Sequence, residues 1–190
     1  SHLSCADNLQ NNFTQIQINN FKKIIKELEN LQIKIRLKHI ANSAGAILWK
    51  ESHFDMVRIG IALYGYLIDY ETKLPIKLQP VLSLKTHITQ IRKITANTGV
   101  SYGHTFISKK DLLIATLAIG YGDGICRSLQ NSQKLLINGE FIEIAGIICM
   151  DQMMVDVTNI KGLEVGDEVI IIGKSKDKKI RGANFLEKSK

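Results

Sequence analysis

Leu74-Pro75-Ile76-Lys77-Leu78-Gln79-Pro80-Val81-Leu82 contains the only two prolines of the chain, and the sequence pattern differs on its two sides. Before this stretch, apolar residues follow a helical spacing and then form short runs of the strand type. After it, short apolar runs are separated by turns that contain glycine. The change predicts a boundary near residue 78, with a partial α/β unit at residues 1–78 and a β-rich domain at residues 79–190.

The segment before the boundary begins with one amphipathic helix, because its apolar residues recur at three- and four-residue steps. Residues 33–39 and 56–61 are expected to be strands, and Ser43 is expected to cap a short helix between them. This α/β alternation is typical of a parallel sheet or a (β/α) barrel. A complete barrel needs roughly 250 residues, so we expect the C-terminal part of a (β/α)8 TIM-like barrel. The residues that define the helix are Phe13, Ile16, Phe21, Ile24, Ile25, Leu28 and Leu31.

The segment after the boundary is expected to form a mostly β-strand domain. Asn138-Gly139 is a strong signal for a hairpin between two of its strands. Further turns are expected at Asn97-Thr98-Gly99 and Val165-Gly166-Asp167. The expected strands are residues 82–94, 112–119, 134–137, 141–148, 153–157 and 168–172.

Composition excludes several classes of function. The 190 residues carry a net charge of +7, but the lysines are dispersed and no aromatic residues alternate with them, so nucleic-acid binding is not expected. No apolar run approaches the roughly 20 residues that span a bilayer, and no signal peptide is recognisable. Cys5, Cys126 and Cys149 form no C-x-x-C pair. We therefore expect a cytoplasmic protein without a metal site or a disulfide framework.

Arg58 lies in the apolar run Val57-Arg58-Ile59-Gly60-Ile61-Ala62-Leu63-Tyr64-Gly65. Burying an unpaired guanidinium is costly, so Arg58 needs a partner. One interpretation is an arginine at a strand end that faces water or a carboxylate. The other is a ligand, since Gly60 and Gly65 leave room for close approach.

Four further segments combine polar side chains with turns or strand ends. In the first, a helix start beside a serine hydroxyl has the ingredients of a phosphate site. Each segment also has a structural interpretation: a helix cap, a packed tyrosine, a turn closed by an aspartate, or a strand that ends in an aspartate. The four are residues 39–43, 99–105, 118–124 followed by Arg127, and 146–152.

Taken together and in order, these segments resemble the alanine racemase family, whose members use pyridoxal 5'-phosphate to interconvert L- and D-alanine for cell-wall peptidoglycan. The resemblance covers nearly the whole chain. It is carried by residues 1–7, 39–44, 57–65, 100–103, 120–124 and 148–152.

The resemblance implies a cofactor site. Arg58 would face the pyridine nitrogen, and because a guanidinium does not readily give up its proton, the ring nitrogen would stay neutral and the cofactor would be a weaker electron sink. This favours proton exchange at the α-carbon over transamination. Ser43 and the backbone of Gly60 and Ile61 would hold the phosphate. The remaining cofactor-site residues implied by the resemblance are His2, His39 and Asn42.

Racemisation requires an acid/base group on each face of the α-carbon. The resemblance assigns one of them to Tyr102, which acts on the cofactor of the partner subunit in a homodimer. Met150 would offer its backbone N–H to the carboxylate of the substrate alanine. Tyr121, Arg127 and Asp151 would line the entrance.

The chain also departs from the family pattern. The Schiff-base lysine of the family lies in an N-terminal K-A-N-A-Y-type motif that this sequence does not contain, and the family's C-terminal segment is absent as well. Ile147 stands where the family often has an arginine. We therefore expect the chain to be inactive alone. Its alternatives are one piece of a split enzyme that assembles with an N-terminal barrel half, a non-catalytic cofactor-binding or dimerising remnant, or the product of a decayed gene.

Overall fold

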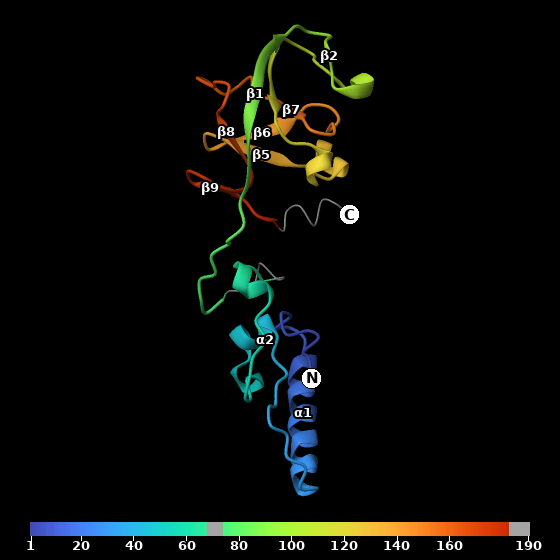
Figure 1. Cartoon of the computed structure of the whole chain (residues 1–190), viewed down its shortest axis with the longest axis vertical. Coiled ribbons are helices and arrows are strands. Elements are labelled where there is room, and N and C mark those ends of the chain that lie inside the picture. Colours follow the sequence, from blue (N-terminus) through green and yellow to red (C-terminus); the bar gives the residue numbers. More distant parts are fainter. Residues whose placement is uncertain (68–73, 183–190) are drawn as a thin grey trace. The chain divides into compact units, whose positions relative to one another are not determined.

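The structure, a computed structural model, describes residues 1–67 and 74–182. The chain forms two compact units, an N-terminal unit (Ser1–Val81) and a C-terminal unit (Leu82–Lys190). Figure 1 shows helices and irregular chain in the first unit and β-strands in the second.

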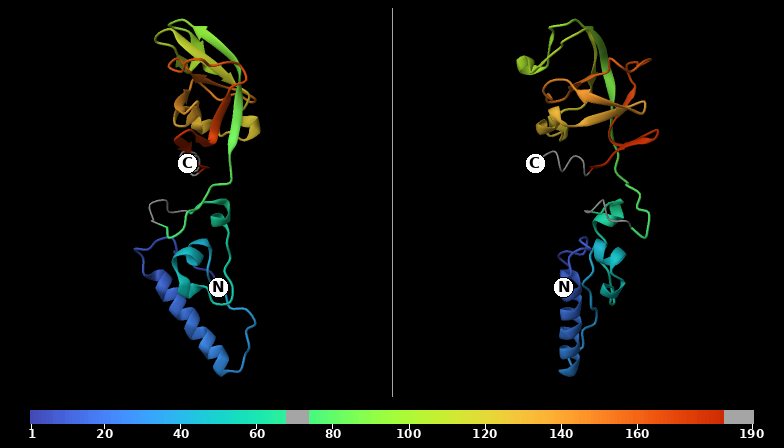
Figure 2. Two further views of the ribbon diagram at one scale, coloured as in Figure 1. Left: turned by 90° about the vertical axis from the view of Figure 1, so that its left-hand side faces the viewer. Right: turned by 180° about the vertical axis from the view of Figure 1, so that it is seen from behind.

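The N-terminal unit contains the predicted amphipathic helix, α1 (Phe13–Asn30), which is confirmed. The chain then runs back towards the start of α1 (Figure 2) and enters a short helix, α2 (Ser43–Leu48). Two 3-10 turns follow, η1 (Lys50–Ser52) and η2 (Ile61–Tyr64). The core of the unit contains Leu3, Ala6, Ile18, Ile40, Ala44 and Leu67.

The prediction of strands at residues 33–39 and 56–61 is wrong for this structure. Two backbone bonds lie at the edges of these segments: Asp55 N donates to Lys38 O at 3.0 Å, and Arg58 N donates to Ala41 O at 3.1 Å. From the first bond to the second, the residue number rises by three in both chain segments, as it does between parallel strands. A strand needs a continuous ladder on at least one side, and two isolated bonds do not provide it.

The C-terminal unit is a closed antiparallel barrel, which confirms the β-rich prediction. Six strands close in the order β1-β4-β7-β6-β5-β8, and β8 pairs back with β1. Closure is possible because β1 is long: its second half pairs with β4 and its first half with β8. Closing the sheet leaves no exposed edge among these six strands. The bounds are β1 (Leu84–Ile94), β4 (Leu112–Leu117), β5 (Lys134–Ile137), β6 (Glu140–Ile144), β7 (Met153–Asp156) and β8 (Glu168–Ser175).

Up to residue 182, where the described part of this unit ends, it also contains three short strands and three 3-10 turns, and the sequence does not predict these strands. β9 (Lys178–Ile180) forms a hairpin with β8, and β2 (Gly99–Val100) pairs with β3 (Phe106–Ile107). The 3-10 turns are η3 (Tyr102–His104), η4 (Tyr121–Asp123) and η5 (Arg127–Asn131). The predicted hairpin turn joins β5 to β6, and Asn138 (φ 49°) and Gly139 (φ 81°) have the positive φ values that this turn type requires.

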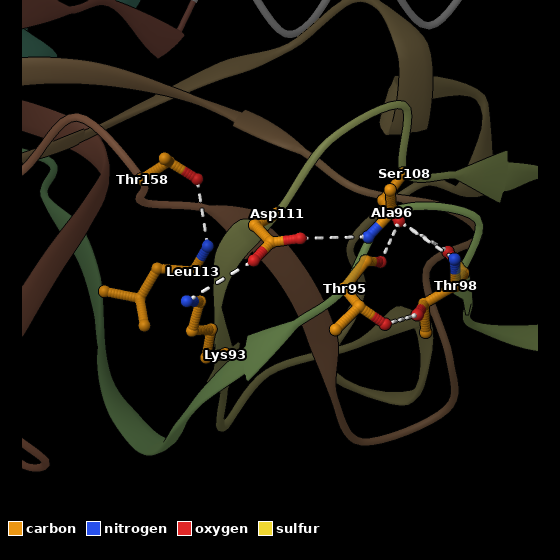
Figure 3. Close-up of polar contacts among 8 residues, drawn as sticks. All are labelled: Lys93, Thr95, Ala96, Thr98, Ser108, Asp111, Leu113 and Thr158. Atoms are coloured by element: carbon orange, nitrogen blue, oxygen red, sulfur yellow. Dashed lines mark hydrogen bonds and ion pairs between the residues drawn. The ribbon is translucent and has the colours of Figure 1, made fainter.

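Residues 95–108, here called the arm, extend from the end of β1 and carry β2, η3 and β3. Its base is fixed by hydrogen bonds (Figure 3). The hydroxyl of Ser108, which is 1% exposed, donates to Thr95 O at 2.7 Å and accepts from Thr98 N at 2.9 Å. The Asp111 carboxylate accepts from Ala96 N at 3.2 Å. These bonds tie the two ends of the arm to each other and to Asp111, the residue before β4.

Candidate active site

The N-terminal unit contains a pocket of about 320 Å³. Four of the seven residues predicted to bind the cofactor line it: His2, Asn42, Ser43 and Ile61. They come from three separate parts of the unit, namely the N-terminal segment, the start of α2 and the start of η2. The other lining residues are Leu3, Ser4, Asp7, Ala44 and Leu67.

Ser43 does not cap α2, so that prediction is wrong. Asn42 is the capping residue, because its Oδ1 accepts from Gly45 N at 2.9 Å. Ser43 is the first residue of the helix, and its buried hydroxyl accepts from Gly60 N at 2.8 Å and from Ala62 N at 3.3 Å. The hydroxyl therefore joins the start of α2 to the start of η2. A hydroxyl that accepts two bonds still has its own proton to donate, for example to a phosphate oxygen.

The N-terminal segment that carries His2 is held firmly. Leu3 is 1% exposed, its N–H donates to Ile40 O at 3.2 Å, and its carbonyl accepts from the Asn42 side chain at 3.0 Å. Gly45 is needed beneath it, since a β-carbon there would lie 2.8 Å from Leu3 Cδ1. This packing places His2 at the rim of the pocket.

Arg58 contacts the same segment. Its guanidinium Nη2 donates to the carbonyl of Ser1 and lies 3.1 Å from His2 Nδ1. Among the described residues Arg58 forms no ion pair, and its buried Nε has no hydrogen-bond partner. His39 also has a buried ring nitrogen, Nδ1, without a partner in this part of the chain. A half-buried guanidinium with a buried Nε and no carboxylate partner fits a site for a ligand that accepts hydrogen bonds.

The C-terminal unit carries the remaining predicted residues. Tyr102 lies in η3 at the tip of the arm and is 74% exposed. The residue before it anchors the tip: Ser101 Oγ donates to Ile147 O at 2.6 Å and lies 3.5 Å from Cys149 Sγ. Tyr102 is thus attached to the loop at residues 146–151, which also contains Met150 and Asp151.

That loop packs directly on the turn that carries Tyr121. Tyr121 N donates to Cys149 O at 2.9 Å, and Gly122 N donates to Met150 O at 2.8 Å. The backbones are so close that a β-carbon at Gly120 would lie 2.3 Å from Met150 O. The turn itself is closed by Asp123, whose carboxylate accepts from Gly120 N at 2.9 Å, as its structural interpretation predicted.

The described contacts therefore gather the five predicted residues of this unit around connected loops. The Arg127 guanidinium lies 5.8 Å from the centre of the Tyr121 ring, within cation–π range. Asp151 and Met150 are exposed beside them. Ser101, Cys149 and Ala62 have no role in the sequence-based prediction, because their importance lies in contacts across loops and residue type alone does not encode those.

The described residues contain no cluster of three or more His, Cys, Asp or Glu side chains that could hold a metal ion. None of their helices has the length and apolar character needed to cross a membrane.

Comparison with known proteins accounts for both units. The model of the alanine racemase N-terminal domain matches residues 1–68, and that of the alanine racemase C-terminal domain matches residues 81–190. "Alanine racemase 2" of Caldanaerobacter subterraneus is 40% identical over 188 residues, which are 99% of this chain and 48% of that protein.

Solved structures give the same result. The alanine racemase of Clostridium difficile 630 in complex with cycloserine has a TM-score of 0.89 and 34% identity, and covers 99% of this chain and 49% of its own. That of Bartonella henselae with covalently bound pyridoxal phosphate has a TM-score of 0.80 and 33% identity, and covers 93% and 47%. The chain spans about half the length of the curated relatives that it matches. On these grounds the chain belongs to the alanine racemase family.

Proposed function

We propose that this chain is the C-terminal portion of a pyridoxal-phosphate-dependent alanine racemase, which interconverts L- and D-alanine in the cytoplasm and supplies D-alanine for peptidoglycan. Its N-terminal unit would be the last part of a (β/α)8 barrel, in which residues 33–39 and 56–61 become strands once the rest of the barrel supplies neighbours. The two backbone bonds at the edges of these segments, Asp55 N to Lys38 O and Arg58 N to Ala41 O, advance in parallel and support this. The single observation that carries the proposal is the pocket lined by His2, Asn42, Ser43 and Ile61.

The residues of the N-terminal unit fit pyridoxal phosphate. A volume of about 320 Å³ lies within the range of small-molecule sites. The unpaired guanidinium of Arg58 would donate to the pyridine nitrogen, and His2, which touches it, would lie against the ring. The Ser43 hydroxyl and the backbone of Gly60 and Ile61 would hold the phosphate, with Asn42 and His39 beside them; Gly60 N, which donates to Ser43 Oγ in this structure, would turn to a phosphate oxygen when the cofactor binds. When bound, the cofactor withdraws electrons from the α-carbon of the substrate and so makes its proton removable.

The C-terminal unit would supply the proton chemistry. Tyr102 would exchange a proton with one face of the α-carbon, and its exposure on the arm suits action on the cofactor of a partner subunit in a homodimer. The opposite face needs a second acid/base group. We assign that role to the lysine of the family's N-terminal motif, carried by the first half of the barrel. The Met150 backbone N–H would hold the substrate carboxylate, and Tyr121, Arg127 and Asp151 would line the entrance.

The test is reassembly. This chain is co-expressed with a lysine-bearing N-terminal half of an alanine racemase, and D-alanine formation from L-alanine is measured together with bound cofactor. We expect turnover from the assembly and none from the 190-residue chain alone. Tyr102→Phe should lower turnover by roughly 10²- to 10⁴-fold, the usual contribution of a general acid/base, without changing cofactor content.

Two outcomes would count against the proposal. Cofactor binding without any turnover in the assembly would favour a non-catalytic, cofactor-binding remnant. Turnover of the Tyr102→Phe assembly at the parent rate would remove Tyr102 as the acid/base group.

A further inference from the structure

Ser101 has a backbone conformation that is unfavourable for every residue except glycine. Its φ of 65° and ψ of −178° lie in a region where a β-carbon is crowded by the neighbouring peptide groups. Gly103 (φ 66°) and His104 (φ 45°) in the same turn also have positive φ. A turn of this kind persists only when contacts from outside hold it in place. Tyr102 lies in the middle of it.

The hydroxyl of Ser101 makes such a contact. It donates to Ile147 O at 2.6 Å and lies 3.5 Å from Cys149 Sγ, on the loop at residues 146–151. That loop is shaped to receive it: Gly146 has a φ of 86°, and a β-carbon there would lie 2.8 Å from Ser101 Cβ. Glycine at position 101 would adopt the turn at lower cost. Serine is less favourable than glycine in this conformation, but it provides the hydroxyl that bonds Ile147 O.

The same loop is bonded to the turn that carries Tyr121. Tyr121 N donates to Cys149 O, and Gly122 N donates to Met150 O. The Ser101 hydroxyl is thus the side-chain link between the tip of the arm and the two loops that hold Met150 and Tyr121. At its base, the arm is held separately by Ser108 (Figure 3).

We propose that Ser101 is a positioning residue for racemisation: its hydroxyl fixes Tyr102 at a set distance from the backbone N–H of Met150. The proposal rests on the proposed function, in which Tyr102 exchanges the proton and Met150 holds the substrate carboxylate. Both groups belong to the C-terminal unit, so they would reach the substrate together. A loose arm would let the acid/base group drift from the bound α-carbon, and small errors in position are costly in catalysis.

The first measurement needs neither cofactor nor activity. Ser101→Ala keeps the β-carbon and removes the hydroxyl, whereas Ser101→Gly also removes the backbone strain. Amide hydrogen exchange is followed by mass spectrometry on the 190-residue chain. In both variants we expect residues 99–104 and 146–151 to exchange about tenfold faster, as the loss of one hydrogen bond predicts. Cys149 should also be alkylated faster.

The matched control is Ser175→Ala. This serine is also half-buried and also makes one hydrogen bond to a backbone group, from Gly139 N at 3.0 Å, but on the hairpin turn between β5 and β6. We expect it to leave exchange in the arm unchanged. Ser101→Gly removes the hydroxyl but also relieves the backbone strain, so its melting temperature should not fall below that of the parent. Faster exchange in this variant would then come from the lost contact and not from a less stable fold.

The second measurement uses the racemase assembly. Both Ser101 variants should lower kcat about tenfold and change KM much less, since a misplaced acid/base group affects the chemical step. With α-deuterated L- and D-alanine as separate substrates, the isotope effect should rise for one enantiomer only, the one whose proton Tyr102 removes. A merely less stable enzyme would lose active molecules and leave both isotope effects as they were.

The exchange and kinetic measurements can each overturn the proposed role of Ser101. Parent-like exchange in both Ser101 variants would overturn the proposal, as would faster exchange with unchanged kcat and isotope effects. If Tyr102→Phe racemises at the parent rate, the proposed acid/base assignment fails and the catalytic role of Ser101 falls with it. Exchange data would then still show whether the hydroxyl holds the turn, so the two failures are distinguishable.

Discussion

The guanidinium Nη2 of Arg58 lies 3.1 Å from Nδ1 of His2. Arginine can only donate hydrogen bonds, so His2 Nδ1 must accept this one, and a neutral His2 ring then carries its proton on Nε2. The pair divides its roles: Arg58 provides the permanent positive charge, and His2 helps to orient it. Because no carboxylate pairs with Arg58 among the described residues, this charge is available to a ligand.

Arg58→Lys should show whether this orientation matters. Nη2 alone bonds both the Ser1 carbonyl and His2 Nδ1, so the planar guanidinium keeps its other nitrogens for a ligand, whereas a lysine has one nitrogen for all three partners. We expect turnover of the racemase assembly to fall about 100-fold, the typical effect of removing one preorganised donor, together with weaker cofactor binding measured by absorbance. Arg92→Lys on the exposed face of β1 is the matched control and should retain parent activity. Equal activity in both variants would rule out a specific role for the guanidinium.

The strands of the barrel could be predicted from sequence because each one has a local pattern of apolar and turn residues. Apolar runs flanked by turn residues marked six of them, and Asn138-Gly139 marked a hairpin whose positive φ values the structure confirms. Closure of the sheet is different in kind. It depends on β1 pairing with β4 along one half and with β8 along the other, and no local pattern records which strands lie next to each other.

In the candidate site too, the sequence indicates local features but not the contacts between distant residues. The pattern around residues 39–43 indicated a serine beside a helix start, but Asn42 and Ser43 are both residues that cap helices well. Only the structure shows that Asn42 takes the cap and leaves the Ser43 hydroxyl to bond Gly60 and Ala62. Similarly, nothing in a serine at position 101 indicates a positive φ.

Asn42→Ala should destabilise the N-terminal unit, because the side chain makes two bonds. Its Oδ1 caps α2 at Gly45 N, and its Nδ2 donates to Leu3 O at 3.0 Å. Loss of a cap costs about 1 kcal/mol and loss of the second bond a similar amount. Asn42→Asp keeps the cap and loses only the bond to Leu3, so denaturant unfolding should place it between Asn42→Ala and the parent. A reversed order would contradict the assigned roles.

Cys126 should react at lower pH than an ordinary cysteine thiol. A hydrogen bond from the Ser128 side chain, with help from the Ser128 backbone, lowers the pKa of the exposed Cys126 thiol. A lowered pKa means that the thiolate form appears at lower pH, and the thiolate is the reactive form. Ser128→Ala should return the pKa towards its ordinary value and move the pH profile of alkylation upward. Iodoacetamide rates at each cysteine, read by mass spectrometry, test this, with Cys5 as the internal reference.

Gly120→Ala tests the contact between the two loops of the C-terminal unit by sterics alone. The φ of Gly120 is −150°, which any residue adopts, so an alanine would bring no backbone strain. Its β-carbon, however, would lie 2.3 Å from the carbonyl oxygens of Cys149 and Met150, and backbone atoms cannot move aside cheaply. Overpacking of this kind costs about 1–3 kcal/mol.

The loops should separate in Gly120→Ala and break the bonds from Tyr121 N and Gly122 N. Gly162→Ala is the opposite control: its φ of 69° is unfavourable for alanine, but no atom lies within 4 Å of the added carbon. Both variants should therefore lose stability in denaturant unfolding, through different causes. Only Gly120→Ala should also speed hydrogen exchange at residues 146–151 and raise KM for alanine, because only there does the loop that carries Met150 move. If the two glycine variants behave alike, the loop contact has no bearing on substrate binding.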